Sequence, residues 1–392
     1  MTRILSDRVQ SIKPSSTLAV TAKANALRKK GRNIISLGAG EPDFDTPAHI
    51  KAAACQAIAD GQTHYTPVDG TPQLKQVIAD KFRKDNQLEY SLEQIIVSSG
   101  CKQTFFNLVL ALLNTGDEVI IPAPYWVSYP DMILIAGGKP VIVSSDMASR
   151  FKITPEQLEK AITPKTKLVV LNSPSNPSGV AYSKKELEQL GAVLVQHPDI
   201  MIASDDIYEH ILWNQEGFCN MAMACPELVD RTIILNGVSK AYAMTGWRIG
   251  YAAGPEQLIK AMKKIQSQST SNPCSIAQAA ALEAISGNQD CVQTLCQTFK
   301  KRHDFVYERL NDIKGVKVIP CDGTFYTFPD FNGPMKTHHI ESDSQLASTL
   351  LEQGVALVPG SAFGAPGHLR LSFTLEITQL ETAMDCLQKA LG

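Results

Sequence analysis

The 392-residue chain lacks the features that mark several classes of protein. Its formal net charge is −2 and no lysine- or arginine-rich block stands out, so we expect no nucleic-acid-binding or membrane-binding face. The most apolar helix-like run, residues 105–113, is far too short to span a bilayer. Residues 1–16 contain no apolar core of the kind found in secretory signals.

Cysteine and histidine are present, but not in metal-binding patterns. The nine cysteines include no CxxC pair, and the spacing of the closest two, Cys291 and Cys296, matches no metal motif. Their odd number and the missing signal predict free thiols in a reducing cytoplasm. The eight histidines form no ligand-like cluster, so we expect no metal.

Hydrophobic residues make up 44% of the chain, and no repeat or long linker interrupts them. At roughly 150 residues per domain, the length suggests two or three domains. Short apolar runs alternate with helix-length segments, which predicts an α/β fold with a mainly parallel sheet covered by helices on both faces. Such sheets bind ligands at the carboxyl ends of their strands. The runs are 93–100, 117–126, 138–145, 167–179, 199–210, 231–240 and 248–254.

The pattern of predicted helices and strands changes after about residue 285. ALEAIS and then residues 291–313 have the pattern of a long amphipathic helix, followed by short strand signals. We therefore predict a large domain over 47–285 and a smaller α+β domain formed by 1–46 and 286–392. The strand signals are VKVIP (316–320), GTFYTF (323–328), VALVPG (355–360) and HLRLSF (368–373).

One lysine and one arginine stand in an otherwise uncharged stretch, NGVSKAYAMTGWRIGYAAG, at 236–254. A solvated surface position is the usual fate of a lysine, but the neighbours of Lys240 are small or aromatic. A desolvated amine near other positive charge, such as Arg248, is reactive or can form a Schiff base with a carbonyl. Asp205, just past another apolar run, is either a turn aspartate or a buried carboxylate that needs a cationic partner.

Other candidates follow further strand-like runs. Gly100, Cys101 and Lys102 open a helix whose backbone N–H groups could bind an anion, although glycine is common in such turns. Trp126 either fills the core or offers a flat face. Arg370, in an apolar strand, suits a carboxylate.

Two further residues have ordinary explanations when taken singly. Asn176 is by default a turn residue and Tyr208 a core residue. Taken together, the candidates supply an amine, a carboxylate, a phosphate cradle, a flat aromatic and two isolated arginines at one sheet edge. Pyridoxal 5′-phosphate is a ligand whose chemical groups need this set of side chains.

Several motifs resemble class I (fold type I) aminotransferases, close to the I-beta subgroup of bacterial aspartate aminotransferases. SKAYAMTGWRIGY at 239–251 resembles the cofactor-lysine motif of that family, and the likeness covers essentially the whole chain. It implies fold type I, with a mainly parallel seven-stranded sheet in the large domain and a smaller α+β domain. The other matching motifs are GEPDFDTP, PYWVSYP, NSPSNPSG and SDDIYEH.

The resemblance also implies roles for the residues that bind the cofactor. Lys240 matches the lysine that attaches it and later moves a proton, and Asp205 matches the partner of its ring nitrogen. Arg248 matches a phosphate ligand, assisted by the backbone near Gly100, Cys101 and Lys102. The remaining matches are Asn176 and Tyr208 at the ring's 3-oxygen, Trp126 over the ring, and Tyr65, which would reach the phosphate of a neighbouring subunit in a homodimer.

The substrate site is implied in the same way. Arg370 matches the clamp on the α-carboxylate, with Gly40 beside it, and Asn176 and Trp126 also face the substrate. Lys102 matches a lysine that holds the distal carboxylate, with hydroxyls from Ser15 and Thr17. These matches imply transfer of the amino group from L-aspartate to 2-oxoglutarate by a ping-pong mechanism.

Alternatives remain open at this level. The same class includes enzymes for aromatic amino acids, prephenate, alanine or kynurenine, and the same fold includes β-eliminating or cyclopropane-forming lyases. Aminotransferase-like ligand sensors in transcription regulators carry a DNA-binding domain ahead of the fold, whereas the pattern here begins within the first dozen or so residues. Cys101 replaces the glycine or alanine usual in relatives, and a thiol beside an aldehyde would add redox sensitivity.

The GAG at 38–40 faintly resembles a dinucleotide-binding loop. It lacks the third glycine of such a loop, so we do not expect a dinucleotide to bind there.

Overall fold

The computed structural model describes residues 4–14 and 16–392. Its centre is a seven-stranded sheet with the order β2-β8-β7-β6-β5-β3-β4. Only β8 runs against its neighbours, so the predicted mainly parallel sheet is confirmed. The strands are β2 (Ile95–Ser98), β3 (Glu118–Ala123), β4 (Lys139–Ser144), β5 (Thr166–Asn172), β6 (Met201–Asp205), β7 (Thr232–Gly237) and β8 (Gly250–Ala253).

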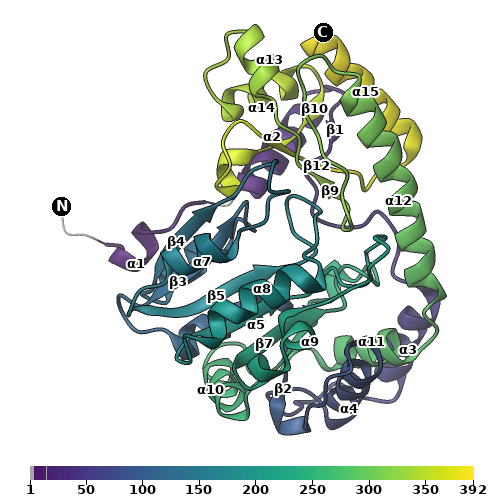
Figure 1. Cartoon of the computed structure of the whole chain (residues 1–392). Helices are drawn as coiled ribbons and strands as arrows, with labels where there is room; N and C mark the ends of the chain where they lie inside the picture. The colour runs from purple at the N-terminus through teal and green to yellow at the C-terminus, as the bar shows by residue number, and fades with distance from the viewer. Residues whose placement is uncertain (1–3, 15) are drawn as a thin grey trace.

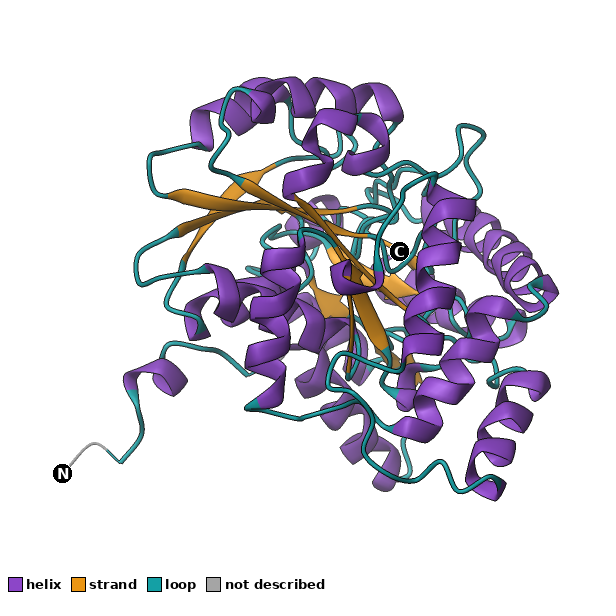
Figure 2. Cartoon of the chain, turned by 90° about the horizontal axis from the view of Figure 1, so that it is seen from below, coloured by secondary structure: helices purple, strands orange, loops and turns teal. Residues whose placement is uncertain are grey.

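Helices cover both faces of this sheet (Figures 1 and 2). Strand β5 shows why, because successive side chains point to opposite faces. Leu168 and Val170 join a core with α5, α6 and α10, whereas Val169 and Leu171 join a core with α7, α8 and α9. The helices around the sheet are α3 (Ala48–Ala59), α4 (Pro72–Lys81), α5 (Cys101–Leu112), α6 (Tyr129–Ile135), α7 (Pro155–Ala161), α8 (Lys184–Val195), α9 (Met221–Ala224), α10 (Glu256–Ser267) and α11 (Ser275–Ser286).

A second group of elements lies above this sheet in Figure 1 and has its own core. Strand β1 (Ile35–Ser36) pairs in parallel with β10 (Val355–Ala356), and β11 (Val358–Pro359), β12 (Leu369–Ser372) and β9 (Tyr326–Thr327) form an antiparallel sheet. The helices of this group are α2 (Ser16–Lys29), α12 (Asp290–Asn311), α13 (Asn332–Thr337), α14 (Asp343–Glu352) and α15 (Ile377–Leu391), while α1 (Asp7–Gln10) contacts α6.

Helix α12 connects the two cores. Val292, near its start, packs with α3, α4 and α11, whereas Leu295, less than one turn later, packs with the core of the second group. We therefore propose that the domain boundary lies near the start of α12, with 47–285 in the large domain and 1–46 and 286–392 in the small one. No helix in the described ranges 4–14 and 16–392 is long and apolar enough to cross a membrane.

One strand prediction is wrong. The segment VKVIP at 316–320 is not a strand, and its only β contact is an isolated bridge between Lys317 and Asp330. The apolar alternation is real, because Val316 and Val318 are buried in the core of the second group. Within the described part of the chain, the pairing extends no further than this one bridge, so burial produces the alternation that resembles a strand.

Candidate active site

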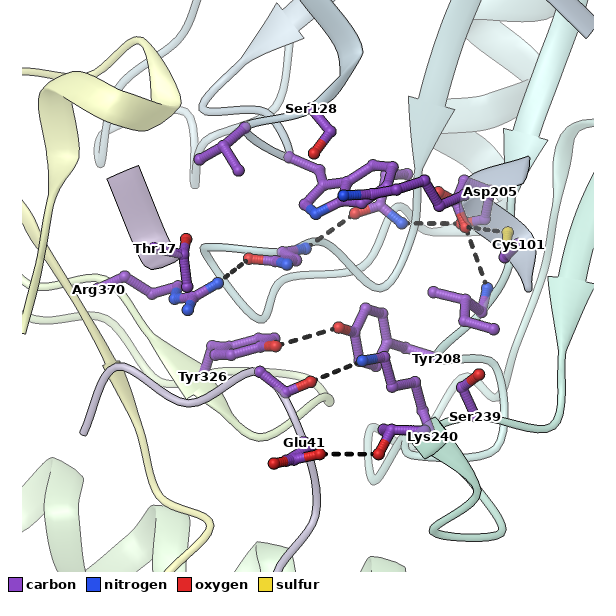
Figure 3. A pocket seen from close by; sticks show the side chains of 18 of the residues that line it. Thr17, Glu41, Cys101, Ser128, Asp205, Tyr208, Ser239, Lys240, Tyr326 and Arg370 are labelled. Atoms are coloured by element: carbon purple, nitrogen blue, oxygen red, sulfur yellow. Dashed lines mark hydrogen bonds between the residues drawn. The ribbon is translucent and has the colours of Figure 1, made fainter. Parts of the chain in front are cut away.

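A cavity of about 450 Å³ opens where strands of the large sheet end (Figure 3). Side chains that follow β2, β3, β5, β6 and β7 line one wall, and residues of the second group of elements line the other. The predicted site residues that meet here are Thr17, Gly40, Cys101, Lys102, Trp126, Asn176, Asp205, Tyr208, Lys240, Arg248 and Arg370. The ends of parallel strands thus gather residues that are far apart in the sequence.

Lys240 stands in the turn after β7, at the floor of the cavity. Its Nζ donates a hydrogen bond to the backbone oxygen of Gly40, over 2.6 Å. Burial, followed by the positive charges of Arg370 and Arg248, lowers the pKa of this amine to about 8. Roughly a tenth of the amine is then uncharged at pH 7, far more than for an ordinary lysine. A partly neutral amine of this kind can attack a carbonyl or accept a proton.

Asp205 ends β6 and is only 5% exposed. Tyr129 donates its hydroxyl hydrogen to one carboxylate oxygen, and the Cys101 thiol lies 3.9 Å from the other. Burial raises the pKa of Asp205 to about 6, while the hydrogen bond from Tyr129 opposes that rise. A cationic nitrogen bound beside this carboxylate would keep it ionised and would itself be kept protonated.

An anion cradle lies at the start of α5. Gly100 precedes the helix with a φ of 91°, and a Cβ at this position would overlap the Arg248 guanidinium. Arg248 donates to the backbone oxygens of Thr245 (2.9 Å) and Ser99 (3.4 Å). The positive end of a 12-residue helix and a guanidinium that donates to two neutral backbone oxygens suit a phosphate dianion.

Arg370, on β12, forms the opposite end of the cavity. It is 2% exposed, and it donates to Asn176 Oδ1 (3.0 Å) and to the backbone oxygen of Gly38 (2.9 Å). Its Nε is buried and has no hydrogen-bond partner among the residues that the structure describes. A buried guanidinium held by neutral oxygens, with a donor left over, is prepared to receive a carboxylate.

The structure places the other predicted residues as follows. Lys102 Nζ lies 5.0 Å from the centre of the Trp126 ring, at the edge of the cavity. Gly100 does not line the cavity but lies against Arg248. Tyr65 is 91% exposed and lies outside the cavity of its own chain. Ser15 lies outside the described residues.

Several residues of the site were not predicted. Tyr129 follows Trp126 within PYWVSYP, so its place in a matched motif could have identified it. Glu41 follows Gly40 and accepts a hydrogen bond from Thr245, another lining residue. The other unpredicted lining residues include Ser128, Ser239 and Tyr326.

The environment of Cys101 argues against redox sensitivity. Burial raises the pKa of its thiol well above the ordinary value, and the charges of Asp205 and Asp206 raise it further. The thiolate is the reactive form, so a thiol with a raised pKa is comparatively inert. The structure instead favours a role as a weak hydrogen-bond donor to Asp205.

These groups fit pyridoxal 5′-phosphate. The cradle beside Gly100 and Arg248 suits its phosphate, Asp205 its ring nitrogen, and the Lys240 amine its aldehyde. Its 3-oxygen would take hydrogen bonds from Tyr208 and Asn176, which line the same cavity. No group of three or more potential metal-binding side chains is found in the part of the chain that the structure describes.

Comparisons with known proteins agree with this chemistry. The chain is 57% identical over 393 residues to the aspartate/prephenate aminotransferase of Nitrosomonas europaea, covering 98% of this chain and 97% of the relative. It is 56% identical over 375 residues to the enzyme of the same name from Cereibacter sphaeroides, covering 94% of each.

Solved structures show the same similarity. The aspartate aminotransferase from Rhizobium meliloti superposes with a TM-score of 0.95 at 47% identity, covering 99% of this chain and 98% of that one. The enzyme from Thermus thermophilus with maleate has a TM-score of 0.94 at 44% identity, covering both chains fully (100%). The family model described as aminotransferase class I and II matches residues 32–387. The chain therefore belongs to the class I and II aminotransferases and is a pyridoxal-phosphate-dependent transaminase.

Proposed function

We propose that this enzyme transfers the amino group of L-aspartate to 2-oxoglutarate and forms oxaloacetate and L-glutamate. The observation that carries the substrate assignment is the placement of Lys102 at the edge of a cavity whose α-carboxylate site is Arg370. Besides Lys240 and Arg248, which the cofactor would engage, the cavity is lined by the cations Lys102 and Arg370, and this pair favours substrates with two carboxylates over neutral amino acids. Thr17 lines the same cavity and offers a hydroxyl.

The residues divide the reaction among themselves. Arg370 fixes the α-carboxylate and thereby places the substrate Cα near Lys240. When bound, the cofactor supplies an electron-withdrawing ring that makes the Cα proton acidic. Lys240 Nζ accepts that proton and holds it for delivery, while Asp205 maintains the positive charge of the ring nitrogen. Tyr208 and Asn176 orient the ring from the other side.

Prephenate is a second candidate acceptor. The relatives from Nitrosomonas europaea and Cereibacter sphaeroides are named for both aspartate and prephenate. Prephenate is a 2-oxo acid with a second carboxylate, so the same two cations would suit it. A ping-pong sequence, in which the first 2-oxo acid leaves before the second binds, would accommodate both acceptors at one site.

The direct test is a coupled assay of the purified enzyme with aspartate and 2-oxoglutarate, in which oxaloacetate is reduced as it forms. Activity should require the acceptor, and prephenate should be able to replace 2-oxoglutarate. Release of pyruvate or ammonia from an amino acid without any acceptor would instead identify a lyase.

Replacing Lys102 with alanine should raise the KM for aspartate about tenfold or more, because the distal carboxylate loses its cation. The KM for phenylalanine, which has no distal carboxylate, should change less than about twofold and serves as the internal control. Both constants are measured by steady-state kinetics on the same preparation. Equal changes for the two amino acids would contradict the assignment of Lys102.

We further propose that the working unit is a homodimer in the cytoplasm. The support for a dimer is Tyr65, which is 91% exposed and does not line the cavity of its own chain, and Ile58, which precedes it in the sequence and is 55% exposed. Nine unpaired cysteines favour a reducing compartment. Light scattering should give about twice the 42.7 kDa mass of one chain, and a monomeric, fully active enzyme would contradict the dimer.

A further inference from the structure

Tyr326 contacts both Arg370 and Tyr208, although no sequence motif identified it as a site residue. It lies on β9, lines the cavity and is 1% exposed. The centre of its ring lies 4.3 Å from the Arg370 guanidinium carbon. Its hydroxyl accepts a hydrogen bond from the Tyr208 hydroxyl over 3.3 Å. One side chain thus joins the carboxylate clamp to a residue of the cofactor site (Figure 3).

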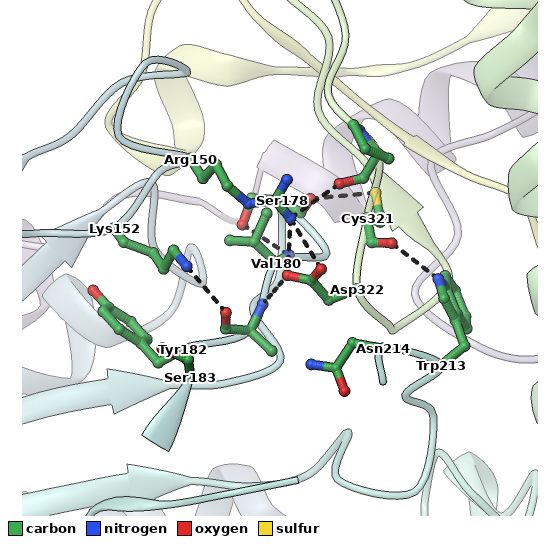
Figure 4. Close-up of polar contacts among 12 residues, drawn as sticks. Arg150, Lys152, Ser178, Val180, Tyr182, Ser183, Trp213, Asn214, Cys321 and Asp322 are labelled. Carbon is green, nitrogen blue, oxygen red and sulfur yellow. Dashed lines mark hydrogen bonds and ion pairs between the residues drawn. The ribbon is translucent and has the colours of Figure 1, made fainter. Parts of the chain in front are cut away.

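The backbone before Tyr326 is held firmly in place (Figure 4). Asp322 accepts hydrogen bonds from Arg150 Nη2 (2.9 Å) and from the backbone N–H of Ala181 (2.9 Å). The backbone N–H groups of Asp322 and Gly323 both donate to the carbonyl of Gly179. These contacts tie the turn before β9 to the loop after β5.

That same loop carries Asn176, which accepts a hydrogen bond from Arg370. Two partners of the guanidinium, Asn176 and Tyr326, therefore belong to segments that are fixed to each other. Trp213 Nε1 adds a further bond to the backbone oxygen of Cys321 in this turn, over 2.9 Å. A ring mounted on so constrained a segment can hold a long side chain in a single orientation.

Arginine needs such a restraint because it has many rotamers and a planar fork. Of its N–H donors, Nη1 is bonded to Asn176 and Nη2 to Gly38, while Nε has no partner among the described residues. The plane of the guanidinium decides whether the remaining donors meet a carboxylate side by side. A stacked aromatic face fixes that plane and attracts the charge.

Building on the proposed function, we propose that Tyr326 is a positioning residue for the substrate. Its ring orients Arg370 to receive the α-carboxylate. Because the single Tyr208 hydroxyl hydrogen would point to the 3-oxygen of the bound cofactor, the Tyr326 hydroxyl would then donate to the Tyr208 oxygen and restrain this phenol. The ring should therefore affect substrate binding, and the hydroxyl should affect the rate of the bound complex. These two contributions can be separated by substitution.

The experiment compares the holoenzyme with Tyr326→Met, which keeps bulk without a π face, and Tyr326→Phe, which removes only the hydroxyl. The measurements are the Kd of maleate, an unreactive dicarboxylate, by calorimetry, and KM and kcat for aspartate and phenylalanine. Phe328→Leu is the matched control, because Phe328 is also buried just after β9 but belongs to a different core cluster. Thermal unfolding of each variant checks that it is folded.

Tyr326→Met should weaken maleate binding about tenfold and raise KM by a similar factor for both amino acids, since both carry the α-carboxylate. Tyr326→Phe should keep the maleate Kd within about twofold and lower kcat several-fold. Wild-type maleate affinity in Tyr326→Met would overturn the role of the ring. Unchanged kcat in Tyr326→Phe would overturn the role of the hydroxyl. If Tyr326→Met does not fold, the near-isosteric Tyr326→Phe variant still tests the role of the hydroxyl.

Failure of the proposed function gives a different result. In that case the wild-type enzyme and Phe328→Leu would show no activity with aspartate. The KM for phenylalanine, or for another amino acid that is accepted, would still report on Tyr326, because every amino acid presents an α-carboxylate to Arg370.

Discussion

Replacing Lys240 with alanine should lower kcat by at least about 10⁴-fold, the largest effect expected for any single side chain here. The reason is that, in the proposed mechanism, the amine serves both for covalent attachment of the cofactor and for proton transfer. Its pKa of about 8 makes it suited to both. Single-turnover kinetics with aspartate would measure the loss, and borohydride reduction followed by peptide mapping would locate the attachment in the wild-type enzyme.

Lys240→Arg is the matched control for charge. It keeps a cation at this position, but arginine does not lose its proton in proteins and cannot accept one from the substrate. We therefore expect it to be nearly as inactive as the alanine variant. Normal turnover by either variant, or borohydride trapping of the cofactor on a different lysine, would refute the assignment of Lys240.

Asp205→Asn should lower kcat by about 10²–10³-fold, because a neutral amide cannot stabilise a positive ring nitrogen. The pH dependence should change as well. The pKa of Asp205 in the cofactor-free protein is about 6, so the carboxylate is increasingly protonated below that pH. Cofactor affinity should therefore fall more steeply in the wild-type protein than in Asp205→Asn as the pH drops through about 6, because the protonation of the cofactor's phosphate, whose second pKa is about 6, weakens binding to both proteins alike.

Asp206→Asn provides the control for Asp205. Asp206 is equally buried, but it is bonded to Ser204 and Asn220 and does not line the cavity. Its kcat should remain within about threefold of the wild-type value. A loss as large as that of Asp205→Asn would show that burial of charge in this region, rather than contact with the cofactor, controls the rate.

The sequence predicted the wall of the site that follows the large sheet, and the physical reason is local. Asp205 ends one apolar strand and Lys240 stands in the turn after another, where an unexpected charge is conspicuous. Thr17 was identified only through the family resemblance, as was the role of Lys102 at the distal carboxylate, and the structure places both residues at the cavity. Their roles, like the domain boundaries, stay predictions.

Other features depend on contacts between distant segments and were not visible in the sequence. Tyr326 lies in an ordinary strand pattern, and its importance arises only from Arg370 and Tyr208 across the cavity. Glycine at position 100 is explained by the Arg248 side chain, which the sequence does not show beside it. Val316 and Val318 show the converse, because burial alone gave them the pattern of a strand.

The path of α12 has a consequence for how the enzyme selects substrates by their length. Residues of this helix pack in both cores, whereas the neighbours of Lys240 in the chain pack in one core and those of Arg370 pack in the other. A change in its tilt would move Arg370 relative to the lining residues of the large sheet, which include Lys102. Because Arg370 and Lys102 are the two cations proposed to hold the carboxylates, discrimination by molecular length would depend partly on a helix that does not line the cavity.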